Sequence, residues 1–257
     1  MRIGIFQSNV SDLTPQQRLA KLASHLTAEP IDLIVCPELF MSGYNVGKQL
    51  PTLAEAVNGQ FCSLARRLAK STQTAIIYGY PETQGQDLYN AAVCIDKHGD
   101  IIANHRKLML PPGFESNYFQ AGDKLTCFEL NGIQCALLVC FDAEFPETIR
   151  AAAESGAELI IIPTALSENW GVVAEKIMPA RAFENGVWVA YANHAGSEGS
   201  MRYFGGSCIV NPVGQDIARA KAEEALIIAE INLDAVKKAQ ARLPYLKRVK
   251  QLRSLLP

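Results

Sequence analysis

The sequence lacks the features that mark several classes of protein. It has no apolar run near the ~18 residues that a membrane span needs, and no signal-peptide pattern follows Met1. Its formal charge is −2, from 24 basic and 26 acidic residues. The protein therefore has no net positive charge that would attract nucleic acid or an anionic membrane. We therefore expect a soluble, cytoplasmic protein whose partner is a small molecule.

The usual spacings of metal and disulfide sites are missing as well. The seven cysteines are an odd number without a C-x-x-C pair, and the four histidines show neither H-x-H nor H-E-x-x-H. Reduced thiols are expected, most of them as small buried hydrophobic side chains. A metal-binding or thiol-redox protein is thus a remote alternative, and we expect no metal and no cofactor.

What the sequence does contain is a series of apolar runs alternating with helix patterns. Strands are predicted over 3–7, 32–36, 74–80, 88–96, 101–107, 125–130, 133–140, 158–162, 187–192, 207–210, 215–218 and 225–231. Helices are predicted over about 14–26, 58–70, 146–155 and 173–185. Pro179 should kink the last of these helices or mark its start.

This order of elements predicts an α/β fold with an internal repeat. Residues 3–107 and 133–220 both follow the order strand, helix, strand, long loop, helix, strand, hairpin. Two mixed sheets packed face to face, each covered by helices outside, would bury all the apolar strands in a four-layer α-β-β-α sandwich. We expect a single domain over 1–257, with 235–257 as a polar C-terminal tail that wraps the body or a partner subunit.

Three reactive side chains stand where apolar runs stop: Glu38, Lys107 and Cys140. Such strand ends can meet in one pocket and supply a base, a cation and a nucleophile. A thiol has an ordinary pKa of roughly 8.5, so Cys140 needs a base, and Glu38 can serve if its own pKa is raised. Lys107 and the backbone N–H of Phe141 would stabilise the oxyanion. The set predicts amide hydrolysis through a thioester.

Each of the three residues also has a simpler interpretation. A cysteine at a strand end is more often inert packing than a nucleophile. Glu38 could be a solvated strand-end carboxylate, and Lys107 a surface cation on an exposed hairpin. The local sequence around each residue decides between the two interpretations.

That local sequence resembles the three signatures of the nitrilase superfamily, the carbon-nitrogen hydrolases. The matching segments are CPELF at 36–40, HRKL at 105–108 and CFDAEFPE at 140–147, with further likeness in YGYPE at 78–82, RAFEN at 181–185, YAN at 191–193 and LPYL at 243–246. The resemblance implies an α-β-β-α sandwich and a catalytic triad of Glu38, Lys107 and Cys140, as the residues themselves suggest.

The resemblance implies further properties. It places a second glutamate at Glu115, to orient Lys107 or hold the substrate nitrogen, although a loop carboxylate in water is the simpler interpretation. The branch that the chain resembles is that of small aliphatic amidases, including the 5-aminopentanamidase type, which usually carry tyrosine where this chain has Phe141. The loop at 109–113 also differs from the aminopentanamidase type. A homodimer or larger homo-oligomer is implied too, and the small face Ala151–Ala153 would permit close helix contact.

Loop residues beside the triad are candidates for contacting the substrate. They are Tyr44, Phe141, Glu144 and Trp170, with Phe40 and His194 as further candidates for lining the pocket. Trp170 is either a lid or a packing residue. Glu144 either faces an amine-bearing substrate or caps the helix that begins at Pro146.

These observations predict an enzyme that hydrolyses a small aliphatic amide to a carboxylic acid and ammonia. Nitrile hydrolysis and N-carbamoyl amine hydrolysis by the same triad are the alternatives, because they differ in how the pocket polarises the substrate. A non-catalytic protein that keeps the fold is a remote possibility, since all three triad residue types are present.

Overall fold

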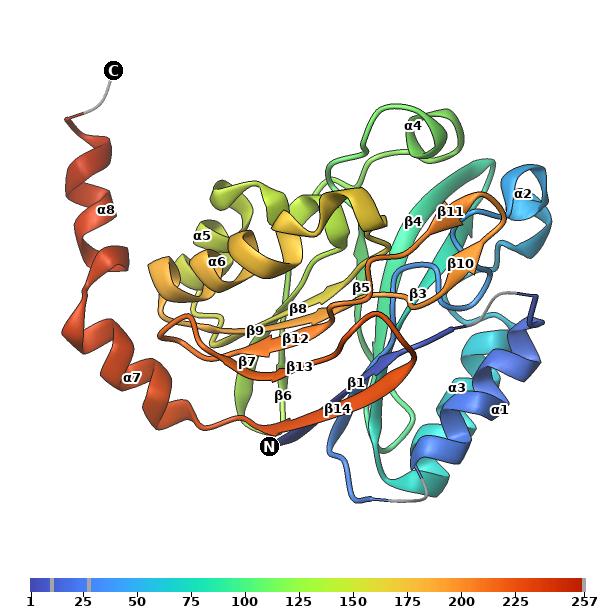
Figure 1. The fold of residues 1–257 in the computed structure, drawn as a ribbon, viewed down its shortest axis with the longest axis horizontal. Coiled ribbons are helices and arrows are strands. Elements are labelled where there is room, and N and C mark those ends of the chain that lie inside the picture. Colours follow the sequence, from blue (N-terminus) through green and yellow to red (C-terminus); the bar gives the residue numbers. More distant parts are fainter. Residues whose placement is uncertain (10–11, 27–28, 256–257) are drawn as a thin grey trace.

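The computed structural model describes residues 1–9, 12–26 and 29–255, and its centre is a pair of six-stranded mixed sheets (Figure 1). The first sheet has the order β14 (Ala225–Glu230), β1 (Arg2–Gln7), β2 (Leu33–Val35), β3 (Ala75–Gln84), β4 (Asp87–Ile95) and β5 (Ile101–Arg106). The second has the order β13 (Asp216–Arg219), β12 (Cys208–Val210), β9 (Trp188–Ala192), β8 (Leu159–Pro163), β7 (Ile133–Leu137) and β6 (Thr126–Leu130).

The two sheets share one pairing pattern, as the repeated element order predicts. Strands β1, β2 and β3 run parallel, and so do β7, β8 and β9. Each parallel set is flanked by antiparallel strands: β14, β4 and β5 in the first sheet, and β6, β12 and β13 in the second. Two strands come from outside the expected halves: β6 precedes the second half and pairs with β7, and β14 crosses from the end of the chain to pair with β1.

Three hydrophobic layers hold the sandwich together, and alternate strand residues face different layers. The middle layer joins the sheets, with Ile5 and Val35 from one and Leu137 from the other. Ile34 and its outward neighbours pack under α1 (Pro15–Leu26) and α3 (Gln60–Thr72). Ile160 and its neighbours pack under α5 (Pro146–Glu154) and α6 (Met178–Asn185). The predicted four-layer α-β-β-α sandwich is confirmed.

Local signals in the sequence account for several boundaries. Thr14 and Gln17 exchange hydrogen bonds across the start of α1, a reciprocal cap that satisfies two helix-terminal N–H groups. Asn131 and Gly132 both have positive φ, 52° and 76°, which suits the predicted two-residue turn between β6 and β7. Pro179 lies in the first turn of α6, directly after a π-helical turn at Val173–Ile177. It therefore marks the start of the α-helix, one of the two outcomes expected.

Further helices and one small hairpin lie outside the two sheets and the helices that cover them. They are α2 (Leu50–Leu53), α4 (Phe114–Tyr118), the hairpin of β10 (Ser197–Glu198) and β11 (Met201–Arg202), α7 (Leu233–Arg242) and α8 (Tyr245–Arg253). The last two lie in the segment for which no strand was expected, and α8 extends along one side of the molecule without a buried residue (Figure 1). The homodimer stays a prediction, and Ala152 and Ala153 are buried against this chain's own sheet. Within the described ranges no helix is long and apolar enough to cross a bilayer.

Candidate active site

Glu38, Lys107 and Glu115 meet at the carboxyl ends of the strands in the first sheet. Glu38 follows β2, Lys107 directly follows β5, and Glu115 lies on α4. The Lys107 ammonium donates to Glu38 Oε1 at 2.7 Å and to Glu115 Oε1 at 2.6 Å. All three side chains are at most 1% exposed. The interpretations of Glu38, Lys107 and Glu115 as solvated surface residues are therefore wrong.

Asn90 in β4 joins the two carboxylates. Its Nδ2 donates to Glu38 Oε1 at 2.7 Å and to Glu115 Oε2 at 3.0 Å. The Tyr44 hydroxyl donates to Glu115 Oε1 at 2.7 Å. Glu38 Oε2 has no hydrogen-bond partner among the described residues. One oxygen of Glu38 is therefore held in place, and the other can accept a proton.

Sequence reasoning missed Asn90, although a signal for it exists. An amide in the middle of an apolar run, with Ala91, Ala92 and Val93 directly after it, must be paired if it is buried. Its side chain is fully buried. The sequence alone does not say which partners the amide has, because they come from two distant segments, the loop after β2 and the helix α4.

Cys140 lies on a tight turn between β7 and a short helix. The strand was predicted to run to Cys140, but β7 ends at Leu137, and Cys140 opens a 3-10 helix over Cys140–Glu144. Asp142 explains the early end, because its Oδ2 accepts the backbone N–H of Val139 at 3.1 Å and draws the chain out of the sheet. Cys140 itself has φ 45°, a left-handed conformation that costs a non-glycine residue roughly 1–3 kcal/mol.

Asp142 also ties this turn to the segment that carries the lysine. Its Oδ1 accepts the backbone N–H groups of Leu108 and Met109 at 2.9 and 2.8 Å, and its Oδ2 accepts from His105 Nε2 at 3.0 Å. The carboxylate is fully buried. Asp142 therefore fixes Cys140 relative to Lys107, a role that the sequence analysis did not assign to it.

The pKa values in this cluster keep the proton on the thiol and give Glu38 the pKa of a base that works near neutral pH. Burial, opposed by the charge of Lys107, raises the pKa of Glu38 to about 7. Burial raises the pKa of the Cys140 thiol, and the charge of Glu38 raises it further while that of Lys107 lowers it. The three groups thus lie within electrostatic range of one another. Because the thiol is protonated at neutral pH, attack by its sulfur requires a base beside it.

Lys107 keeps its proton in this setting. Burial lowers its pKa, but the charges of Glu38, Cys140 and Glu115 outweigh that effect and raise the pKa above its usual range. An ammonium fixed by two carboxylates is a permanent positive charge beside the thiol. Such a charge is suited to stabilising an oxyanion.

A cavity of about 430 Å³ opens onto Cys140, which is half-buried. Its lining includes each predicted substrate-contacting residue, namely Tyr44, Phe141, Glu144 and Trp170, together with Glu115. Trp170 is 62% exposed and so is not a packing residue. Phe40 does not line the cavity but belongs to the hydrophobic layer under α1. His194 lies behind Glu38, where its Nε2 donates to the Glu38 backbone oxygen at 2.7 Å.

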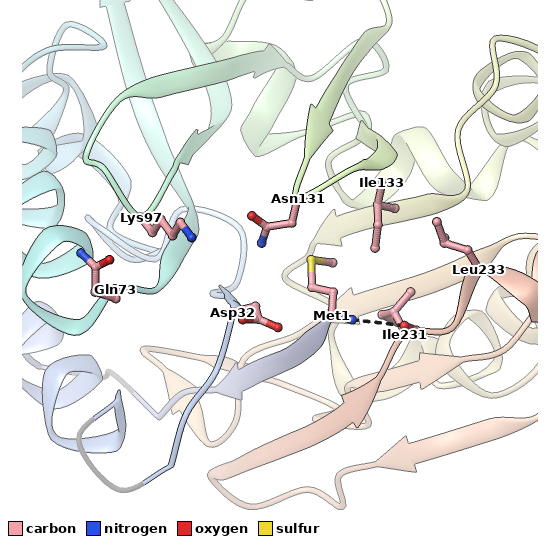
Figure 2. Close-up of a pocket in the computed structure, with 8 residues that line it drawn as sticks. All are labelled: Met1, Asp32, Gln73, Lys97, Asn131, Ile133, Ile231 and Leu233. Atoms are coloured by element: carbon pink, nitrogen blue, oxygen red, sulfur yellow. Dashed lines mark hydrogen bonds between the residues drawn. The ribbon is translucent and has the colours of Figure 1, made fainter.

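A second cavity, of about 460 Å³, lies at the other ends of the strands (Figure 2). Asp32 precedes β2, Gln73 precedes β3, and Ile133 begins β7, whereas Glu38 and Cys140 follow β2 and β7. No cysteine is among the described residues that line it. The candidate active site is therefore the cavity at Cys140.

Comparison with known proteins agrees with this geometry. The family model for carbon-nitrogen hydrolases matches residues 2–241. The chain belongs to the carbon-nitrogen hydrolase family. This hydrolase is 41% identical to a Pseudomonas protegens protein described as a hydrolase in the pqqF 5′ region, with 96% of this chain and 88% of the relative covered. It is 33% identical to an (R)-stereoselective amidase of a Pseudomonas species, over 84% and 78% of the two chains.

A solved structure provides the structural comparison. The amidase of Nesterenkonia sp. AN1, as a cysteine-to-alanine variant in complex with butyramide, has a TM-score of 0.81 and 32% identity to this hydrolase, and 95% of each chain is covered. These findings confirm the expected nitrilase-superfamily membership, the expected fold and the expected class of enzyme, one that hydrolyses carbon-nitrogen bonds.

Proposed function

We propose that this hydrolase converts a small aliphatic amide to a carboxylic acid and ammonia through a thioester on Cys140. Glu38 is the general base, Lys107 stabilises the oxyanion, and Glu115 holds Lys107 in place. The observation that carries the proposal is a buried ammonium held between two carboxylates, beside a cavity-lining cysteine. Tyr44, Phe141, Glu144 and Trp170 contact the substrate.

The first step is attack on the amide. Glu38 takes the proton of the Cys140 thiol as the sulfur bonds to the carbonyl carbon, which is favoured by a base pKa of about 7. Negative charge moves to the carbonyl oxygen. The Lys107 ammonium and the Phe141 backbone N–H stabilise that oxygen, and one such donor contributes about 3 kcal/mol.

The intermediate then collapses, and water completes the cycle. Protonated Glu38 gives its proton to the nitrogen, the C–N bond breaks, and ammonia leaves a thioester on Cys140. Glu38 next takes a proton from water as the water oxygen attacks the same carbon. The C–S bond breaks, the acid departs, and the proton returns to the sulfur. Because no electrons are lost or gained overall, the cycle needs no redox cofactor.

Two relatives support an amide as the substrate. The Nesterenkonia enzyme binds butyramide, and the Pseudomonas relative is named as an amidase. The cavity here is of a size that suits a molecule this small. Nitrile and N-carbamoyl amine hydrolysis by the same residues remain the second candidates, since each also forms a covalent bond from Cys140 to the substrate carbon.

The test is ammonia release from a panel of short amides, nitriles and N-carbamoyl amines. We expect amides to be turned over by the wild type, and release to fall by at least about 10³-fold in Cys140→Ala because the nucleophile is gone. Cys127→Ala is the matched control, since Cys127 is an exposed thiol outside the cavity. Release from nitriles alone would favour the nitrilase alternative. Full activity in Cys140→Ala would end the proposal.

A further inference from the structure

The loop that carries Tyr44 is held by a glutamate from the other half of the chain. Glu198 ends β10, and 154 residues separate it from Tyr44. Its Oε2 accepts the backbone N–H groups of Tyr44 at 2.9 Å and of Asn45 at 2.7 Å. Asn45 Nδ2 donates in turn to the Glu198 backbone oxygen at 2.8 Å. One side chain therefore fixes the backbone that carries the Tyr44 hydroxyl.

The loop is shaped to receive this carboxylate. Gly43 has φ 91°, in the region that favours glycine. A Cβ at this position would overlap Glu198 Oε1. Successive backbone N–H groups in such a turn point into one concavity, which binds an anion. The Glu198 carboxylate occupies that concavity.

Two further side chains hold Glu198 in place. The Tyr203 hydroxyl donates to Glu198 Oε2 at 2.7 Å, and Arg18 Nη2 lies 3.8 Å from Glu198 Oε1. The side chain of Arg18 is 3% exposed and that of Glu198 is 13% exposed. Hydrogen bonds to a charged group are stronger than neutral ones, and burial strengthens them further. The position of the loop is therefore set mainly by Glu198.

Tyr44 connects this loop to the candidate active site. Its hydroxyl donates to Glu115 Oε1 at 2.7 Å, and the same oxygen accepts from Lys107 at 2.6 Å. Without the hydroxyl, Lys107 would be the sole donor to that oxygen among the described residues, so the carboxylate could turn and the ammonium could move with it. A misplacement of about 1 Å can cost about 10²-fold in rate.

We propose that Glu198 is a positioning residue for Lys107. It holds the loop, the Tyr44 hydroxyl holds Glu115, and Glu115 holds the ammonium where the oxyanion forms. The inference rests on the proposed amide hydrolysis and adds a residue outside the lining of the Cys140 cavity. Met201 of the same hairpin does line that cavity. A test must therefore separate an effect through the Tyr44 hydroxyl from a change in the cavity wall.

The test is a double-mutant cycle on the short amide that the wild type hydrolyses best. Glu198→Ala should lower kcat about 10- to 100-fold and change KM less than about threefold, because the lost interaction acts on the transition state. In Tyr44→Phe the same replacement should lower kcat less than about twofold further, because the hydroxyl is already gone. Glu168→Gln is the control and should keep the wild-type kcat, since its exposed carboxylate pairs with Arg202 of the hairpin at 3.9 Å.

A conservative variant separates hydrogen bonding from charge. Glu198→Gln keeps an acceptor oxygen for the loop but no charge for Arg18, so kcat should recover to within about fivefold of the wild type. If Glu198→Ala does not fold, Glu198→Asp takes its place in the cycle, because it keeps a charge beside Arg18 but is one bond shorter. A loss of kcat that is equal with and without the Tyr44 hydroxyl overturns the proposal. Glu198→Gln as slow as Glu198→Ala overturns it too.

A measurement without amide turnover separates this inference from the proposed reaction. The charge of Lys107 lowers the pKa of the Cys140 thiol. A displaced ammonium should therefore slow alkylation by iodoacetamide at a fixed alkaline pH, followed on the peptide that contains Cys140. We expect alkylation to slow by at least about threefold in Glu198→Ala, half a pKa unit, and to be equally slow in Tyr44→Phe and in the double variant. This pattern in a chain that hydrolyses no amide would keep the positioning role and reject the reaction. An unchanged rate in Glu198→Ala overturns the positioning role.

Discussion

The two cavities of this hydrolase are similar in size but differ in chemistry. The cavity at Cys140 has about 430 Å³ and the one at the opposite strand ends about 460 Å³. The first is backed by buried, mutually bonded charges, whereas Asp32 and Lys97 in the second are exposed. Volume therefore does not distinguish the candidate active site from the second cavity. Desolvated charges that act on one another do, since burial strengthens their interaction.

The polar groups of the second cavity bond mainly to backbone. Asp32 Oδ2 accepts the Arg2 backbone N–H at 2.7 Å. The Met1 ammonium donates to the Ile231 backbone oxygen at 3.3 Å, the bond drawn as a dashed line in Figure 2. These bonds hold the beginning of β1 between the strands that flank it. The comparison suggests that one end of the sandwich closes the fold and the other carries the chemistry, which variants at each end can test.

Among variants that leave Cys140 in place, the largest loss of activity is expected when Glu38 is replaced. Glu38→Gln keeps the shape and the contact to Lys107 but removes the base, so amide turnover should fall about 10²- to 10⁴-fold. Because the thiol then keeps its proton, no acyl adduct should form, and intact-mass spectrometry after mixing with substrate checks this. Alkylation of Cys140 by iodoacetamide at alkaline pH, where part of the thiol is ionised without a base, is the control that the side chain is still reachable. A normal acyl adduct in Glu38→Gln would remove the general-base assignment.

A smaller, pH-dependent effect is expected at Asn90. Glu38 must be ionised to take the proton, so kcat/KM should fall as the pH drops through about 7, the pKa of Glu38. The hydrogen bond from Asn90 favours the ionised form and lowers that pKa. Its removal in Asn90→Ala should move the acid limb of the pH profile upward by about one unit, a tenfold loss at pH 6.

The matched control for Asn90 is Asn104→Ala. Asn104 lies in the neighbouring strand β5 and bonds Tyr80 and Glu82 rather than the active-site carboxylates. Its pH profile should keep the wild-type midpoint. If Asn90→Ala lowers the maximal kcat/KM but leaves the midpoint of the pH profile unchanged, Asn90 shapes the cavity without affecting the pKa of Glu38.

Much of this architecture could be predicted from sequence because each element carries its own signal. Continuous apolar runs predict the buried parallel strands, and the repeated order of elements predicts the two sheets. The place of β14 was not predictable in this way, since its pairing partner β1 lies more than 200 residues earlier in the chain. Sheet edges depend on such long-range pairing rather than on local pattern.

The residues of the candidate site also divide into those that the local sequence indicates and those that it does not. Glu38, Lys107 and Cys140 could be singled out as candidates because each ends an apolar run inside a distinctive local sequence. Asn90 and Asp142 were missed because their contacts exist only between segments: Asn90 bonds the loop after β2 and the helix α4, and Asp142 bonds the chain on either side of the site. The end of β7 was predicted too late for the same reason. The apolar run continues to Cys140, but the hydrogen bond from Val139 to the Asp142 carboxylate ends the strand earlier.

The smallest effect is expected at the second cavity, where Lys97 occupies the turn between β4 and β5. Lys97→Ala removes an exposed charge at the amino ends of β2 and β3, whereas Glu38 and Cys140 lie beyond the carboxyl ends of β2 and β7. Charges exposed to solvent are screened within about 8 Å at physiological ionic strength. We therefore expect kcat/KM for amides within about twofold of wild type, measured beside Glu38→Gln in the same assay. A tenfold loss of kcat/KM in Lys97→Ala would mean that the two ends of the sandwich are coupled through the sheets. The burial of charges at the Cys140 end would then not be enough to explain why the reaction takes place there.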